Sequence, residues 1–278
     1  NVVSLTNGTF TASGSTLRAN AGTNAKVLYV TGNSPTMTVT GSRLEATANN
    51  YLVYLQFANP NKLAITTSQL LAATPTNRTV FIDNCPGWTC YQTNPDYTGQ
   101  PVNFTNNWWG TADPAAISAQ IYDYADGTWQ APKIAFDPFL DGPNGTSRFG
   151  IYRRNIPVSS FIPPTETVAL DLYSLEPSNW AATFRDSQGQ LVRTITAANT
   201  TDFFVSWNGT RDDGTTVVPR GLYTYTLDAV NPVSSLTAAP YVNAVWVLTD
   251  GSPVAELTSP TTNQLVNGNS LTMMGTAQ

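Results

Sequence analysis

The segment Phe10-Thr-Ala-Ser-Gly-Ser-Thr-Leu-Arg-Ala19 recurs in related form further along the chain. The second copy is Met37-Thr-Val-Thr-Gly-Ser-Arg-Leu-Glu-Ala46, 27 residues later, and the third is Leu63-Ala-Ile-Thr-Thr-Ser-Gln-Leu-Leu-Ala72, another 26 residues later. Each copy begins with alternating apolar and small or polar residues and ends with a leucine and an alanine. A repeat of this length determines the architecture, so the rest of the sequence is interpreted around it.

A second series of short apolar segments precedes these copies: Val2–Leu5, Val27–Val30, Leu52–Leu55 and Val80–Asp83. Each unit of about 26 residues therefore carries two predicted strands, and one unit alone cannot bury its apolar face. Stacked units give parallel sheets whose valines, leucines and isoleucines point inward. The pattern favours a parallel β-helix of about four coils, with one coil per repeat. An ordinary β-sandwich with a chance repeat is the alternative.

The fourth coil contains an insertion, because the offset from Leu63 to Val102 grows to 39 residues. The insertion holds Cys85 and Cys90. A zinc site would need further ligands, and a redox motif has two intervening residues where this pair has four. We expect a disulfide-closed loop, which is typical of an oxidising compartment. Aromatic residues of the same insertion are possible glycan contacts, although a loop that packs its own side chains is the alternative: Trp88, Tyr91 and Tyr97.

The stretch Asn106-Asn-Trp-Trp-Gly110 leads into the one predicted helix, residues 111–124. Thr111 or Asp113 can cap this helix and Pro114 suits its first turn. Its apolar face would be formed by Ile117, Ile121 and Tyr124.

Together with the later Asp137-Pro-Phe-Leu140, this block resembles the C-terminal end of right-handed parallel β-helix proteins of the pectate-lyase-like superfold. The resemblance covers about residues 80–141. It implies that the helix and the tail close the open end of the stack, which would otherwise be an exposed sheet edge.

The pattern changes after residue 147. Short alternating segments, separated by turn residues, predict an antiparallel β-sandwich: Val168–Tyr173, Trp180–Phe184, Leu191–Ile195, Phe203–Trp207, Gly221–Leu227 and Ala244–Leu248. The run from Trp207-Asn-Gly through Val218-Pro-Arg-Gly-Leu-Tyr223 resembles the immunoglobulin-like domain of flagellar hook-capping proteins and of other secreted bacterial proteins. The resemblance implies a spacer or attachment domain.

Three details of this second region give further expectations. Trp207 and Tyr223 are expected to be apolar anchors on facing strands. Gly214 is expected to supply a positive φ in the intervening turn, although its spacing from Asp212 departs slightly from the family pattern. A calcium site at Asp212 and Asp213 is the alternative to turn chemistry, but two acids fall short of the six to eight oxygen ligands that calcium takes.

Residues 249–278 resemble the first two strands of a bacterial Ig-like repeat, and two strands alone do not form a stable sandwich. Either the chain continues beyond Gln278, or these strands complete a neighbouring molecule by β-augmentation. The predicted organisation is thus 1–147, the end of the β-helix, 148–248, the Ig-like sandwich, and 249–278, the start of another Ig-like domain or donor strands. Self-association or further domains of the same chain are the expected partners.

The composition is typical of an extracellular β-protein, and the resemblances above imply a protein of the bacterial cell surface. Only 11% of residues are charged and the net charge is −5. The chain also carries no basic run, so it shows no charge pattern suited to nucleic acid. It has no apolar stretch long enough to span a membrane. The sequence contains no histidine, which excludes Ser-His-Asp and Cys-His catalysis within these residues. No cofactor motif occurs either.

The predicted fold is all-β, and the predicted function is structural or adhesive, for example in a filament or sheath. The alternatives are the C-terminal part of a polysaccharide lyase or glycoside hydrolase, with its active site outside these residues, and a carbohydrate-binding module. Acids that could serve a hydrolase are sparse in the repeats, and they form no pair in adjacent coils: Glu45, Asp83 and Asp96. Possible N-glycosylation sites, relevant only in a glycosylating host, are Asn7, Asn77, Asn103, Asn144, Asn199 and Asn208.

Overall fold

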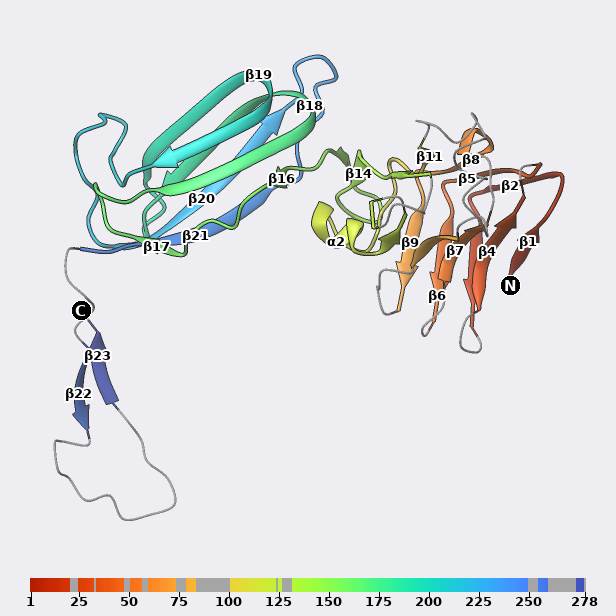
Figure 1. The fold of residues 1–278 in the computed structure, drawn as a ribbon, viewed down its shortest axis with the longest axis horizontal. Coiled ribbons are helices and arrows are strands. Elements are labelled where there is room, and N and C mark those ends of the chain that lie inside the picture. The colour runs from red at the N-terminus through yellow and green to blue at the C-terminus, as the bar shows by residue number, and fades with distance from the viewer. Residues whose placement is uncertain are drawn as a thin grey trace, which may run out of the picture.

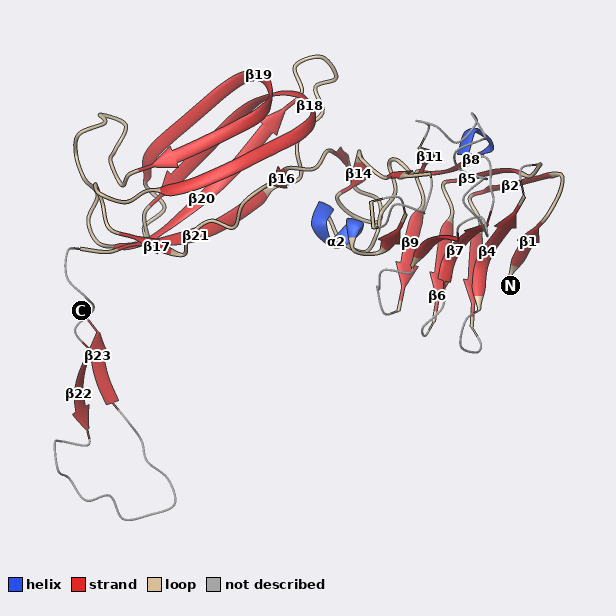
Figure 2. Ribbon diagram, viewed as in Figure 1, coloured by secondary structure: helices blue, strands red, loops and turns tan. Residues whose placement is uncertain are grey.

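A computed structural model describes residues 1–20, 25–32, 34–47, 51–56, 60–73, 79–83, 101–123, 125–126, 132–249, 255–259 and 274–277. In this part of the chain nearly every element is a strand, as Figures 1 and 2 show. The exceptions are one short α-helix and the 3-10 turn η1 (Pro60–Lys62). The all-β prediction is therefore confirmed. None of the described helices has the length and apolar character needed to cross a membrane.

The first part of the chain stacks its strands in three parallel sheets, and we name it the three-sheet unit. Sheet A has the order β1 (Val3–Leu5), β4 (Lys26–Thr31), β7 (Tyr51–Gln56), β10 (Val80–Asp83) and β12 (Ile121–Tyr122). Sheet B has the order β2 (Thr9–Ser13), β5 (Thr36–Thr40), β8 (Leu63–Thr66), β11 (Val102–Asn103) and β13 (Ile134–Ala135). Sheet C consists of β3 (Thr16–Ala19), β6 (Arg43–Ala46) and β9 (Gln69–Ala72).

The strand register follows the sequence repeat. In sheet A, Val3 is opposite Leu28, which is opposite Val53, which in turn is opposite Val80. In sheet B, Phe10 is opposite Met37. The inward-pointing residues of all three sheets form one hydrophobic core of mostly Val, Leu and Ile. Equivalent residues of successive repeats thus lie one above another, which buries the face that one repeat would leave exposed.

The prediction of two strands per repeat is wrong, because each of the first three repeats contributes three. The Phe10–Ala19 segment and its copies are divided between sheets B and C by a sharp corner. The corner residue has a positive φ in each layer: 56° at Gly14, 53° at Gly41, 50° at Thr67 and 58° at Asn106. A left-handed residue turns the chain abruptly and ends the strand there, a conformation that glycine and asparagine adopt most readily.

The predicted helix 111–124 is much shorter in the structure. Helix α2 covers only Pro114–Ser118, with Asp113 as its N-cap and Pro114 in its first turn as expected. The expectation that Ile121 continues the helical face is wrong. Ile121 and Tyr122 instead form β12, in which Ile121 lies opposite Val80 at the end of sheet A. Pairing with β10 at the edge of sheet A therefore outweighs the helical spacing of the local sequence.

The second part of the chain, which we name the antiparallel unit, is built on one sheet with the order β16-β18-β20-β21-β17 and with β19 alongside β18. A short hairpin, β14 (Phe139–Leu140) with β15 (Ser147–Arg148), leads into it. Its strands are β16 (Tyr152–Arg153), β17 (Ser160–Phe161), β18 (Val168–Arg185), β19 (Leu191–Trp207), β20 (Gly221–Val230) and β21 (Tyr241–Val247).

Segments predicted as separate strands are continuous in this unit. Strand β18 joins Val168–Tyr173 to Trp180–Phe184, and β19 joins Leu191–Ile195 to Phe203–Trp207. The register of the β18–β19 pair shifts between Tyr173 and Trp180, where Ser174 and Ser178 are buried. Beyond the shift, β18 pairs with β20, and before it with β16. A bulge of this kind lets one hairpin cover both sides of a single core.

Two further strands follow, β22 (Ala255–Ser259) and β23 (Met274–Ala277), and they pair antiparallel. This agrees with the two strands expected in residues 249–278.

Candidate functional site

The corners between sheets B and C carry a ladder of polar side chains, one per layer. The Ser42 hydroxyl accepts the N–H of Ser15 at 3.2 Å, and the Ser68 hydroxyl accepts the N–H of Ser42 at 3.0 Å. The carboxamide oxygen of Asn107 accepts the N–H of Ser68 at 2.8 Å. Each acceptor lies one layer further along the chain than its donor. The ladder satisfies backbone groups that the sharp corner would otherwise leave unpaired inside the molecule.

Asn107 ends this ladder and differs chemically from the serines before it. Its amide nitrogen donates to the carbonyl oxygens of Ile65 at 2.6 Å and Phe104 at 2.8 Å. The side chain is fully buried. A carboxamide offers both an acceptor and two donors, whereas a hydroxyl has one donor. Asn107 thus ends the ladder beyond β9, the last strand of sheet C.

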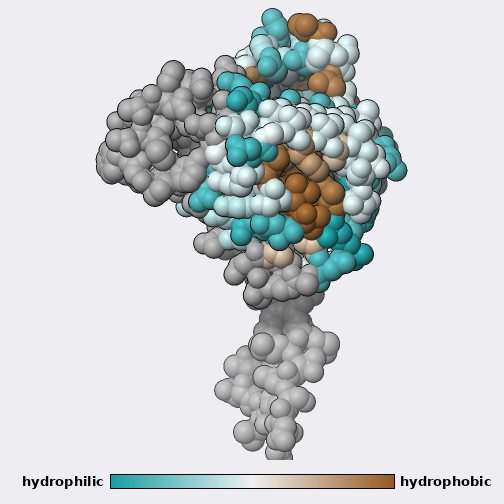
Figure 3. Space-filling model, turned by 90° about the vertical axis from the view of Figure 1, so that its right-hand side faces the viewer, coloured by the Kyte–Doolittle hydropathy of each residue, from teal (hydrophilic) through white to brown (hydrophobic). Residues whose placement is uncertain are grey.

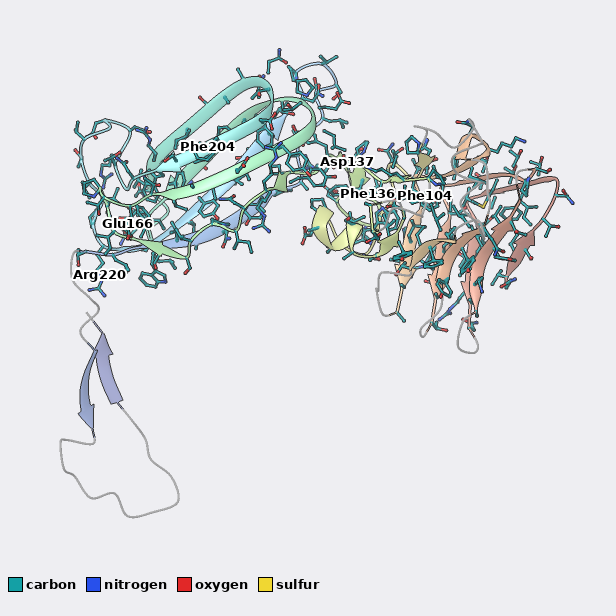
Figure 4. All side chains as sticks on the ribbon, in the orientation of Figure 1. Phe104, Phe136, Asp137, Glu166, Phe204 and Arg220 are labelled. Carbon is teal, nitrogen blue, oxygen red and sulfur yellow. The ribbon has the colours of Figure 1, made fainter. Side chains whose placement is uncertain are left out.

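Aromatic side chains cover the core beyond Asn107. Phe104 and Trp109 are buried with ring centroids 6.2 Å apart, and Trp109 contacts Phe136 edge to face at 6.4 Å. Phe136 in turn packs against the buried Phe139 of the tail. Ile117 of α2 belongs to the same core. Figure 4 shows Phe104 and Phe136 at the end of the three-sheet unit that faces the antiparallel unit. We name this the capped end.

The opposite end of the three-sheet unit has no such cover among the described residues, and we name it the open end. Its apolar side chains are only partly buried, as in Val3, Leu5, Phe10 and Leu17. Figure 3, which looks at this end, shows a hydrophobic area in the middle of the end face. The Ser15 hydroxyl donates to the carbonyl oxygen of Ser13. Among the described residues it accepts no N–H, unlike its equivalents in the later layers.

The capped end is joined to the antiparallel unit through a half-buried carboxylate. Asp137 accepts hydrogen bonds from the Tyr152 hydroxyl at 2.8 Å and from the N–H of Gly150 at 3.0 Å. Burial raises the pKa of Asp137, against the lowering effect of these two donors. Ala239 of the antiparallel unit packs in the core of the three-sheet unit. Asp137 lies at this junction in Figure 4.

A cleft of about 620 Å³ lies beside the junction. It is lined from one side by the start of α2, including Pro114, and from the other by Tyr152, Tyr173 and Tyr241. The cleft holds charged groups that already have partners. Arg153 lies over the Tyr241 ring and donates to its hydroxyl at 2.7 Å. These contacts hold the wall of the cleft in place.

Several residues singled out in the sequence lie outside the described residues, and their predictions stay predictions: Cys85, Cys90, Trp88, Tyr91, Tyr97, Asn77 and Asp96. Four of the remaining sequon asparagines are exposed: Asn7, Asn103, Asn144 and Asn199. Asn208 is half-buried, and its side-chain oxygen accepts hydrogen bonds from the N–H and hydroxyl of Thr210.

Two of the acids considered for chemistry, Glu45 and Asp213, have local partners. Glu45 forms ion pairs with Arg18, at 3.3 Å, and with Arg43 on the outer side of sheet C. Asp213 accepts hydrogen bonds from the Thr216 side chain and from the N–H groups of Thr215 and Thr216. These donors lower the pKa of Asp213 to about 2. Both carboxylates thus have partners that explain their positions.

The remaining expectations for the turn and its anchors are confirmed. Gly214 has a φ of 73°. Trp207 of β19 and Tyr223 of β20 are buried, with ring centroids 5.5 Å apart. The indole N–H of Trp207 donates to the carbonyl oxygen of Thr210 at 2.8 Å, which ties the anchor to its own turn.

Comparison with known proteins agrees with this description of the antiparallel unit. Residues 165–232 match the family model of the FlgD Ig-like domain. The match includes all of β18, β19 and β20 and the turn around Asp213. No curated protein matches the chain. This stretch of the chain is therefore similar to the Ig-like domain of FlgD.

Proposed function

We propose that this chain is a structural or adhesive component of the bacterial cell surface, in which a rigid stack of coils carries Ig-like spacer domains. Residues 1–147 would be the end of a right-handed parallel β-helix, residues 148–248 a hook-capping-type Ig-like sandwich, and residues 249–278 the start of another Ig-like domain. Three parallel sheets with one repeat per layer support the first assignment. The FlgD Ig-like match supports the second.

The observation that carries the proposal is the difference between the two ends of the three-sheet unit. At the capped end, Asn107 terminates the ladder and Trp109 covers the core. At the open end, Phe10 and Leu17 are partly exposed and Ser15 repeats the position of an inner-layer acceptor. A capped end points to a stack that stops at the Ig-like domain, and the partly buried apolar side chains of the open end leave apolar area that another layer would cover.

The junction supports a mechanical role. A flexible tether would leave the two units free to move, whereas here a part-buried hydrogen bond from Tyr152 to Asp137 and the buried Ala239 connect them. Buried polar contacts and shared core packing fix the orientation of neighbouring units. Such a connection suits a protein that projects its domains from a surface at a defined angle.

The experiment that tests this proposal is antibody labelling of the cells that produce the protein. Antibodies against residues 148–248 should label intact cells as strongly as permeabilised ones, and negative-stain electron microscopy should show labelled elongated material on the outside. Label that appears only after permeabilisation would contradict the proposed location. Degradation of a surface polysaccharide by the purified full-length protein would favour the enzyme alternative instead.

A further inference from the structure

The outer edge of β21 is only partly covered by a neighbouring strand. β17 pairs with its last two residues, Trp246 and Val247, and the N–H of Trp246 donates to the carbonyl oxygen of Ser159 at 2.8 Å. The chain before β17 forms β16, which pairs with β18 instead. Figure 1 shows β16 at the end of the antiparallel unit nearest the three-sheet unit and β17 at the far end. Within the described part of the chain, the first residues of β21 therefore have a strand only on the β20 side.

The backbone groups on this edge point away from the sheet. Successive residues of an antiparallel strand direct their N–H and C=O groups to alternate sides. Because Trp246 faces β17, Val242 and Ala244 face the same side, away from β20. The N–H of Ala244 is accepted by the Asn243 side chain at 2.8 Å, whereas no described group bonds the N–H or the carbonyl oxygen of Val242. We name residues 242–244 the free edge.

The cleft of about 620 Å³ described above lies beside the free edge. Tyr241 and Val242 line it from β21, and Arg153 and Ile156 line it from β16 and the chain that follows. Val242 is 64% exposed and Ile156 is 94% exposed, so both walls offer apolar surface. Free backbone groups on a strand edge, with a cleft and apolar side chains beside them, are the features of a site at which an extended peptide adds a strand.

A guanidinium group gives this cleft a charge preference. Arg153 lies over the Tyr241 ring, 4.9 Å from its centroid, and donates to its hydroxyl at 2.7 Å. A guanidinium has more N–H donors than this contact with an uncharged partner uses, and no ion pair within the described residues includes Arg153. The other charged residues of the lining are engaged, since Arg154 pairs with Asp171 and Asp113 caps α2. The cleft thus favours a carboxylate.

We propose that the free edge is a docking site for an extended, acidic segment of another protein, which adds a strand beside β21 and places a carboxylate on Arg153. The segment would pair with the N–H and the carbonyl oxygen of Val242 as a neighbouring strand does. Guanidinium and carboxylate form a charge-assisted pair, which selects an acidic segment over a neutral or basic one. A second copy of this chain is the alternative occupant. The inference goes beyond the structural role proposed above and stands independently of it.

The test is amide NMR of the whole isotope-labelled chain, titrated with short peptides whose ends are blocked. The probe is Thr-Val-Glu-Val-Thr, and Thr-Val-Lys-Val-Thr matches it in length and strand propensity. The acidic peptide should shift the amide signals of Val242 and Asn243 until they saturate. The basic peptide should bind at least about tenfold more weakly. An acidic peptide with methylated backbone nitrogens, which cannot donate to the edge, should not bind.

Two pairs of variants separate the charge from the backbone. Arg153→Met should weaken binding of the acidic peptide at least about fivefold. Arg220→Met should leave it unchanged, because Arg220 is exposed at the end of the unit far from the junction (Figure 4). Val242→Pro removes the N–H that faces the cleft and should abolish binding, whereas Val242→Thr keeps it and should bind within about twofold of the unsubstituted chain. If Val242→Pro fails to fold, the methylated peptide tests the same hydrogen bond.

The proposal is overturned if the acidic peptide leaves the signals of Val242 and Asn243 unchanged, if the basic peptide binds equally well, or if Arg153→Met binds as Arg220→Met does. Sedimentation of the chain without peptide tests the alternative occupant. Self-association that Val242→Pro abolishes and Val242→Thr keeps would assign the free edge to a second copy, and would overturn the proposal as well.

Discussion

The three-sheet unit and the antiparallel unit bury similar numbers of apolar residues in different ways. The first packs mainly Val, Leu and Ile in layers, and each layer contacts chiefly the layers next to it. The second concentrates large rings in one cluster, in which Trp207 contacts Phe161, Phe184 and Tyr223. The free energy of unfolding of a layered stack is close to the sum of the interactions between adjacent layers. That of a single cluster depends on a few side chains.

The largest effect is expected for Trp207→Ala in the antiparallel unit. Trp207 is 1% exposed, contacts three rings and makes a buried hydrogen bond to Thr210. Its truncation should cost about 3–5 kcal/mol of unfolding free energy. Hydrogen exchange should show lost protection in β18 and β20 but not in β5 or β8. Trp246→Ala, at an exposed position, should cost less than about 1 kcal/mol. Equal losses of protection in both units would contradict the view that the ring cluster around Trp207 stabilises the antiparallel unit.

Asn107→Ala should have the next largest effect and should act on the capped end. It leaves the N–H of Ser68 and the carbonyl oxygens of Ile65 and Phe104 without their partner. Buried groups left unpaired cost about 1–3 kcal/mol. Chemical denaturation measures the loss, and hydrogen exchange should locate it in β8, β9 and β11. Protection lost uniformly across all layers would argue against a layered stack.

Ser42→Ala should cost less, about 1 kcal/mol, because it removes a single acceptor for the N–H of Ser15 inside the ladder. Ser15→Ala is the matched substitution at the open end, where no described N–H uses the hydroxyl. Its cost should be close to zero. Thermal midpoints of the two variants give the comparison. A larger loss for Ser15→Ala than for Ser42→Ala would show that the ladder does not run in the direction described.

The smallest effect is expected at the junction and depends on pH. Burial raises the pKa of Asp137, so the folded chain binds a proton there more readily than the unfolded chain. The carboxylate therefore weakens the fold at neutral pH, and this penalty disappears as the pH falls through the raised folded pKa. Asp137→Asn keeps an oxygen acceptor for Tyr152 and Gly150 and should flatten this dependence. Melting curves from about pH 7 to pH 4 measure it, with the exposed Asp228→Asn as control. If the melting temperature of Asp137→Asn depended on pH as that of the unsubstituted chain does, the inference that the Asp137 carboxylate destabilises the folded chain would be contradicted.

Asp213 affects the pH dependence of the unfolding free energy in the opposite direction from Asp137. Its pKa is lowered to about 2 by donors in its turn, so its stabilising contribution is present at neutral pH. That contribution is lost as the pH falls below the usual aspartate range toward 2. The loss of stability on acidification, followed by melting curves at decreasing pH, should therefore differ between Asp213→Asn and the unsubstituted chain only below the usual aspartate range.

The repeat and its register could be predicted from the sequence because the apolar positions are spaced evenly, as in Leu28 and Val53. The corner was not predicted, since Gly14, Thr67 and Asn106 share a backbone conformation but not a residue type. The chain after Ser118 was assigned to the helix because helical spacing was judged locally, whereas β12 forms only against β10. Strand pairing between residues far apart in the sequence cannot be recognised from a short stretch of sequence.

The same limit applies to the candidate sites. Trp207 and Tyr223 were found because a motif contains them, and the structure places their rings in contact. The alignment of Tyr29, Tyr54 and Phe81 on adjacent strands of sheet A was missed, because these residues are far apart in the sequence and align only through the strand register. Aligning the outward positions of each repeat, and not only the inward ones, would have revealed it.

The most direct test of the central claim, that the open end is shaped to stack another repeat, is to add one. A copy of residues 28–52 placed before Val3 puts a second Leu28 one layer ahead of Val3, in the register already seen in sheet A. The account predicts a higher thermal midpoint and slower amide exchange in Thr9–Ser13 and Thr16–Ala19. An unchanged midpoint, with exchange in β2 and β3 as fast as before, would contradict it.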